Sequence, residues 1–155
     1  MTAMASRPRL TERFNDALVF TAELHCMQTR KGEGEIPYIS HLLGVASLVL
    51  EAGGDEDMAI AALLHDAVED QGGMETLERI RHRFGARVAD IVKGCTDDFG
   101  GHTRRSWCER KTKYMEHLRE HSDEETRIVS LADKVHNART ILLDHIEQGD
   151  RVFQR

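Results

Sequence analysis

A helical repeat of apolar residues, broken by glycines and short polar stretches, runs through most of this chain. After Thr11, a typical capping residue, apolar side chains recur about once per turn, which predicts a first helix with these residues facing the core. They are Phe14, Leu18, Ala22 and Cys26. The same reasoning predicts helices over residues 11–26, 37–53, 56–70, 75–84, 86–93, 106–118 and 123–146. Because no segment alternates like a strand and no repeat or Pro-rich linker intervenes, the predicted class is all-α.

The length and composition suit one domain. A chain of 155 residues can bury a core without disulfides, so we treat residues 1–155 as a single compact helical bundle with its core at about 11–146. No apolar run approaches the roughly 20 residues of a membrane helix, so no membrane partner is expected. The first residues lack the apolar segment of a secretory signal, which predicts a cytoplasmic protein. The three cysteines form no CxxC pair and are predicted to be reduced thiols.

The net charge of the chain restricts the kinds of partner that it can bind. A net charge of -6 opposes attraction to a polyanion, so nucleic acid is not an expected partner. Arg30 and Lys31 can still meet a small phosphorylated ligand, since an acidic average does not exclude a positive pocket. The clusters Arg104-Arg105 and Arg110-Lys111-Lys113 are interpreted as solvated surface charge. Nothing in the sequence fixes an oligomeric state.

A histidine and an aspartate lie next to each other inside an apolar segment, ALLHDAVED. Residues 63–64, both leucine, mark the segment as buried, where a charged group is costly. His65 and Asp66 are followed one helical turn later by Glu69 and Asp70. An imidazole and three carboxylates this close together need a compensating cation or strong hydrogen bonds.

Two further helices carry polar residues of the same kind. The apolar run IVSLADKVHNARTILL is interrupted by Asp133, with Asn137 one turn later and Thr140 just beyond. His41 lies early in PYISHLLGVA. Mixed imidazole and carboxylate ligands suit Mn, Fe, Co, Ni or Zn better than Ca or Mg. A metal with an open position acidifies a bound water, so hydrolysis is the simplest chemistry that such a cluster permits.

The remaining histidines have simpler interpretations. A lone histidine is more often a surface or capping residue than a ligand, and this applies to His25, His82, His117 and His121. His136 lies three residues after Asp133 and is interpreted as a structural residue.

The order of three motifs resembles the HD superfamily. PYISH at 37–41, LLHDAVED at 63–70 and LADKVHNART at 131–140, with RK at 30–31 ahead of them, are similar to the alarmone hydrolases. These are the hydrolase domains of RelA/SpoT proteins and the small alarmone hydrolases. The resemblance spans roughly residues 15–145 and is far more specific than an HD dipeptide, which occurs by chance.

The resemblance implies a helical bundle that hydrolyses guanosine tetra- and pentaphosphate, the (p)ppGpp alarmones of the stringent response. The products are GDP or GTP and pyrophosphate, and the usual metal is one manganese ion. By motif position, the metal ligands are His41, His65, Asp66 and Asp133. Glu69 and Asp70, from the family's ED pair, orient or deprotonate the attacking water and handle the leaving oxygen.

The resemblance also implies the substrate contacts. Arg30 stacks on or braces the guanine base, Lys31 lines the nucleotide site, and the nucleoside is bound by Asn137 and Thr140. The chain departs from the family at Leu42, where a proline is usual, and in the loop at 96–105. Family members also continue, beyond the point matching the last residues here, into a helical segment that brings an aromatic residue to the pocket.

Two other functions fit the same residues. The first is an HD hydrolase acting on another nucleotide, such as a nucleoside monophosphate, a deoxynucleoside triphosphate or the 2′-phosphate of NADPH. The second is a catalytically silent nucleotide-binding module. The silent module is disfavoured because it has no need of both Glu69 and Asp70 beside a complete ligand set.

Overall fold

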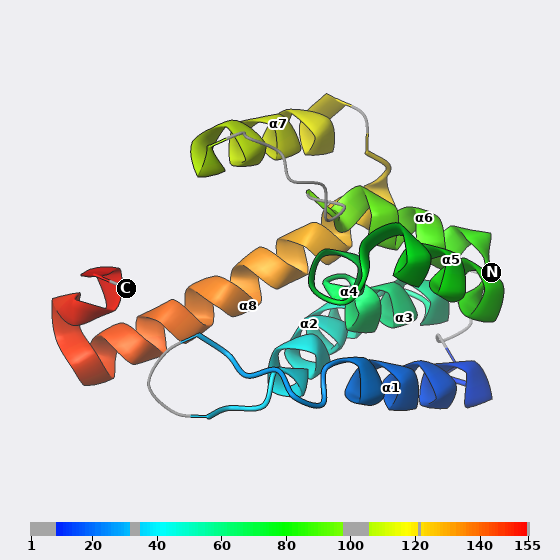
Figure 1. Ribbon diagram of the computed structural model, residues 1–155, viewed down its shortest axis with the longest axis horizontal. Helices are drawn as coiled ribbons and strands as arrows, with labels where there is room; N and C mark the ends of the chain where they lie inside the picture. The colour runs from blue at the N-terminus through cyan, green and yellow to red at the C-terminus, as the bar shows by residue number, and fades with distance from the viewer. Residues whose placement is uncertain (1–8, 32–34, 98–105, 121, 155) are drawn as a thin grey trace, which may run out of the picture.

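The computed structural model describes residues 9–31, 35–97, 106–120 and 122–154 (Figure 1). Within these ranges the chain forms eight α-helices and a 3₁₀ helix, and no strand beyond one isolated bridge between Thr29 and Pro37. The elements are α1 (Glu12–Leu24), α2 (Ile39–Glu51), α3 (Glu56–Leu64), α4 (Ala67–Asp70), α5 (Gly73–Phe84), α6 (Ala86–Cys95), α7 (Trp107–Glu120), α8 (Glu124–Gln148) and η1 (Gly149–Gln154). The all-α prediction is confirmed. The part of the predicted loop at 98–105, with Arg104 and Arg105, and His121 lie outside the described residues.

Helix α3 forms the centre of the core. Every residue from Met58 to Leu64 is buried, because α1, α2, α6 and α8 all pack around this helix. In Figure 1, α3 lies between α1 on one side and the α5 and α6 pair on the other. Burial of this much apolar surface is the main stabilising contribution to such a bundle. The residues that follow α3 therefore start from a fixed position.

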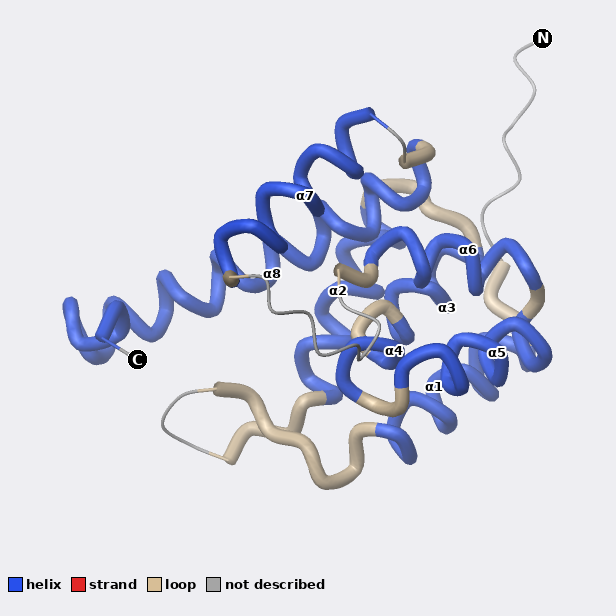
Figure 2. The backbone as a smooth tube through the Cα atoms, turned by 45° about the horizontal axis from the view of Figure 1, so that its top comes forward, coloured by secondary structure: helices blue, strands red, loops and turns tan. Residues whose placement is uncertain are grey.

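The two halves of α8 have different surroundings. Its buried residues all lie in the first ten positions, from Thr126 to Asp133, where the helix packs on α2 and α6. Its second half extends away from the bundle (Figures 1 and 2), and Leu142, Leu143 and Ile146 are exposed there. The 3₁₀ helix then turns back on α8. None of the described helices combines the length and the apolar character needed to cross a membrane.

The predicted core face of the first helix was wrong at its C-terminal end. Ala22 and Cys26 are exposed, whereas the buried residues are Ala17, Phe20 and Thr21. A step of four residues overshoots a full turn by about 40°, so a pattern built only from such steps rotates off the core face. Phe14 and Leu18, at its start, still pack against the core.

The helix predicted over residues 56–70 is broken at the HD dipeptide. α3 ends with His65 as its C-cap, and α4 begins after Asp66, whose backbone has φ -95° and ψ -4°. In a continued α-helix the carbonyl oxygen of Ala62 would accept a hydrogen bond from the amide of residue 66. Here that carbonyl oxygen also lies 2.8 Å from Nδ1 of the His65 ring. The break means that His65 and Glu69 do not lie on one continuous helix, as the sequence pattern suggested.

Candidate metal centre and nucleotide pocket

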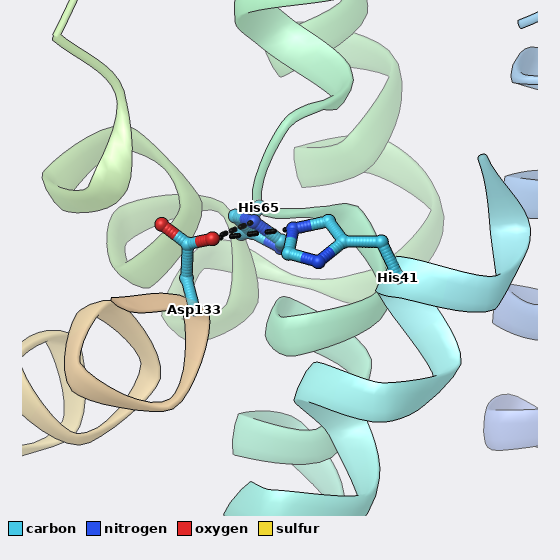
Figure 3. Close-up of side chains that lie close together, drawn as sticks. All are labelled: His41, His65 and Asp133. Atoms are coloured by element: carbon cyan, nitrogen blue, oxygen red, sulfur yellow. Dashed lines mark ion pairs between the residues drawn. The ribbon is translucent and has the colours of Figure 1, made fainter. Parts of the chain in front are cut away.

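Three side chains from three helices converge on one point (Figure 3). His41 lies in the first turn of α2, His65 at the end of α3, and Asp133 in the packed half of α8. The Nε2 atoms of His41 and His65 lie 3.2 and 3.7 Å from Oδ1 of Asp133. One ligand atom from each residue falls within 4.8 Å of the others, and all three residues are buried. These residues form a group that can hold a metal ion.

The His65 ring gives an independent test of that fit. Because a carbonyl only accepts, the 2.8 Å contact with Ala62 requires Nδ1 to carry the hydrogen, and a neutral ring then has its lone pair on Nε2. This Nε2 is buried and makes no hydrogen bond of acceptable geometry. A buried, unpaired donor atom of a ligand-type residue, aimed at a carboxylate, fits a bound cation.

The electrostatics favour positive charge at the same point. Burial alone would raise the pKa of Asp133, but the nearby His41, His65 and Lys134 hold it well below its usual range. Asp66 is affected in the same way: burial raises its pKa, but the charge of His65 outweighs that effect and lowers the pKa below its usual range. Burial lowers the pKa of His65, yet the negative charges of the nearby Asp66 and Asp133 raise it well above the ordinary value. Two ionised carboxylates therefore attract a cation, whether proton or metal.

Asp66, the fourth predicted ligand, lies at the edge of this group. Its Oδ2 is 3.1 Å from Nε2 of His65 and 3.7 Å from Nε2 of His41. The hydroxyl of Tyr38 donates to the same oxygen at 2.5 Å. Tyr38 was not among the predicted site residues, although it belongs to the PYISH motif. Its hydrogen bond orients the Asp66 carboxylate toward the two rings.

The predicted substrate residues Arg30 and Asn137 are connected to the metal group. Arg30 donates through Nη2 to Oδ1 of Asn137 at 2.8 Å, and Nδ2 of Asn137 donates to Oδ1 of Asp133 at 2.5 Å. Lys134 donates to the other oxygen of Asp133. Thr140 donates its hydroxyl to the backbone carbonyl of His136 at 3.0 Å. Asn137 thus lies between a guanidinium and a carboxylate, which fixes the orientation of its amide.

A pocket of about 840 Å³ opens in front of this group, within the size range of small-molecule sites. All the predicted site residues line it except His41, which is buried behind. Four cationic side chains belong to the lining: Arg30, Lys31, Lys111 and Lys134. The sequence interpretation of Lys111 as a solvated surface charge was wrong, because its ammonium forms an ion pair with Asp97 in the pocket.

The two predicted catalytic acids lie on the short helix α4. Asp70 accepts a hydrogen bond from Nε2 of Gln28 at 2.7 Å. The pKa of Glu69 is raised to about 7, first by partial loss of its solvation and then by the hydrogen bond and charge of Asp97. Burial raises the pKa of Asp97, but the hydrogen bond and charge of Lys111 outweigh this effect, so the pKa of Asp97 is lowered. Asp97 was not among the predicted site residues, because its only signal was its place in a polar segment.

Several known proteins are similar to this chain in sequence. The HD domain family matches residues 17–153. The guanosine-3′,5′-bis(diphosphate) 3′-pyrophosphohydrolase MESH1 of Xenopus tropicalis is 42% identical over 128 residues, which cover 81% of this chain and 68% of the relative. The MESH1 protein of Homo sapiens is 38% identical over the same coverage of 81% and 68%. This chain therefore spans about two thirds of the length of these animal relatives.

Two solved structures are similar to this chain in both fold and sequence. A metazoan ortholog of SpoT, described as hydrolysing ppGpp, has a TM-score of 0.76 and 32% identity, covering 87% of this chain and 73% of the other. A crystal structure from Listeria monocytogenes EGD-e has a TM-score of 0.64 and 36% identity, covering 74% and 70%. Because the match over residues 17–153 takes in all three helices that bear the metal group, this chain belongs to the HD domain family.

Proposed function

We propose that this protein is a metal-dependent phosphohydrolase that removes pyrophosphate from the 3′ position of guanosine tetra- and pentaphosphate. The observation that carries the proposal is the buried group of His41, His65 and Asp133, with its unpaired Nε2, opening on a nucleotide-sized pocket. The names of the relatives at 38 and 42% identity support this substrate. In the reaction, water attacks the phosphorus that is attached to the 3′ oxygen. The bond between this phosphorus and the 3′ oxygen breaks, pyrophosphate leaves, and the 3′ oxygen gains a proton.

The metal would be held by His41, His65 and Asp133, with Asp66 as the fourth ligand. Two imidazoles and two carboxylates suit a divalent transition metal, and we propose manganese because the motif resemblance favours it. When bound, such an ion acidifies a water and screens the charge of a phosphate ester. Tyr38 and Asn137 contribute by holding the carboxylates of Asp66 and Asp133 in place.

Glu69 and Asp70 are proposed to move the protons. A carboxyl group with a pKa of about 7 changes its protonation state near neutral pH, which is the condition for an efficient general acid or base. Glu69 accepts the proton of the attacking water, and Asp97 stabilises the protonated state by accepting a hydrogen bond from it. Asp70, held by Gln28, orients the water or the leaving oxygen.

The cations of the pocket are proposed to bind the phosphates. Lys31, Lys111 and Lys134 line the pocket, and a nucleotide with phosphates at both 3′ and 5′ positions can pair with more than one of them. Asn137 and Thr140 bind the nucleoside. Arg30, whose guanidinium lies 5.7 Å from the centre of the Tyr38 ring, braces the base.

A nucleotide panel tests the proposal. Purified protein with manganese is incubated separately with guanosine tetraphosphate, GMP, a deoxynucleoside triphosphate and NADPH, and the products are separated by anion exchange. We expect GDP and pyrophosphate from guanosine tetraphosphate, and no products from an Asp133→Ala control. Faster release of phosphate from NADPH or of triphosphate from the deoxynucleotide would assign another substrate, and no turnover of any nucleotide would support a silent binding module.

A further inference from the structure

The two histidines of the metal group are held by different partners. Nδ1 of His65 faces the Ala62 carbonyl at 2.8 Å, which can only accept a hydrogen bond. Nδ1 of His41 faces Nδ1 of His136 at 2.9 Å. A ring nitrogen can donate or accept, so the state of His136 decides which nitrogen of His41 carries the hydrogen.

His136 is held in a space that only a glycine allows. Its ring meets that of His41 edge-on, with centroids 4.8 Å apart. On the other side, a Cβ at Gly44 would lie 2.3 Å from both Cδ2 and Nε2 of the His136 ring. Gly44 follows His41 by one turn of α2, and α2 packs against α8. The close approach of the two helices therefore fixes the ring beside His41.

We propose that His136 is a positioning residue for the metal: its Nδ1 accepts the Nδ1 hydrogen of His41 and so leaves the Nε2 lone pair of His41 for the ion. His136 thus does for His41 what the Ala62 carbonyl does for His65. The alternative tautomer of His41 carries its hydrogen on Nε2, where Asp133 is 3.2 Å away, and that hydrogen blocks metal binding. The inference rests on the metal site of the proposed function and not on its substrate.

Metal affinity tests the proposal directly. Manganese binding to the chelator-stripped protein is measured by calorimetry for His136→Phe, which keeps an aromatic ring but has no acceptor, and for His136→Asn, whose amide oxygen lies near the Nδ1 position. We expect Phe to weaken binding about 10- to 100-fold and Asn to restore most of it. A His145→Phe control, further along α8, should bind manganese like wild type. Wild-type affinity in His136→Phe, or equal losses in the Phe and Asn variants, would overturn the proposal.

A double-mutant cycle removes the ambiguity of an unstable variant. Gly44→Ala displaces the His136 ring from the opposite helix, so it should weaken metal binding to a similar degree. In a His136→Ala background the new Cβ meets no ring, and Gly44→Ala should add little. Equal effects of Gly44→Ala on metal affinity in both backgrounds would mean that Gly44→Ala does not act through the His136 ring.

Nitrogen NMR of the metal-free protein provides a readout that needs neither metal nor substrate. We expect His41 to carry its hydrogen on Nδ1 in the wild type and to shift toward Nε2 in His136→Phe. Unchanged tautomers would contradict the proposal. A wild-type protein that binds manganese but does not cleave guanosine tetraphosphate would contradict only the proposed substrate, since affinity and tautomer are measured without nucleotide.

Discussion

The two sides of the pocket are built differently. On the metal side, His41, His65 and Asp133 are buried and come from α2, α3 and α8, which pack on one another. On the acid side, Glu69 lies on the four-residue helix α4, and its neighbour Asp97 is paired with Lys111 of α7, a helix that packs sparsely on the rest of the described chain. We infer that a rigid core holds the metal while less constrained elements handle protons and phosphates. Metal binding and turnover should therefore be separable by mutation.

The largest effect is expected for Asp133→Ala, which breaks the metal side. It removes the oxygen that lies near both ring nitrogens, so the remaining ligands no longer converge. Because metal catalysis contributes several kcal/mol, we expect turnover below about one thousandth of wild type together with loss of manganese. Elemental analysis and a pyrophosphate assay measure both, with Asp90→Ala, at an exposed position of α6, as the control. Bound manganese in Asp133→Ala would mean that the other ligands suffice.

Glu69→Gln and Asp70→Asn should reduce turnover without affecting metal binding, and so separate the functions of the two sides. Both amides keep the shape of the acids but cannot transfer a proton, so turnover should fall by roughly 10²- to 10⁴-fold while manganese content stays unchanged. Single-turnover kinetics and elemental analysis are the measurements, and Glu51→Gln is the matched surface control. Nearly full activity in one variant would remove that residue from the proton-transfer steps.

A smaller effect is expected for Arg30→Ala. Loss of a charged hydrogen-bond donor costs about 1.5–3 kcal/mol, which corresponds to roughly a 10- to 100-fold rise in KM if the residue binds substrate. Arg30 also contacts Asn137, which holds Asp133, so manganese affinity is measured beside KM. A drop in metal affinity larger than the change in KM would assign Arg30 to the metal side. Arg119→Ala on α7 serves as the control.

The smallest effect concerns the pH profile. If deprotonated Glu69 is the base, kcat should rise with pH and level off above its pKa of about 7. Asp97→Asn removes the negative charge that favours protonated Glu69, so the inflection should move to lower pH, by about one unit. An inflection that stays in place in Asp97→Asn, or persists in Glu69→Gln, would show that another group titrates.

The helices, and the residues that the structure brings together as a candidate metal group, could be predicted because both leave local signals in the sequence. Apolar periodicity marks α3 and α8, and His65 and Asp133 stand out as polar groups within apolar runs. The contacts between distant segments left no such signal. His136 reaches His41 across 95 residues, and Lys111 lies in a run of charges that is typical of a solvated surface. The helix break at residues 65–66 was also missed, because no glycine or proline marks it.

That break has an evolutionary consequence. Since α3 ends and α4 begins within one dipeptide, a single inserted residue between His65 and Asp66 would carry one of them away from the site. The segments that separate His41 from His65, and Asp66 from Asp133, contain loops whose length can vary without moving the ligands. Selection should therefore preserve the dipeptide as an undivided unit while the intervals on either side drift. A search for distant members should anchor on this pair and allow gaps in the loops on either side.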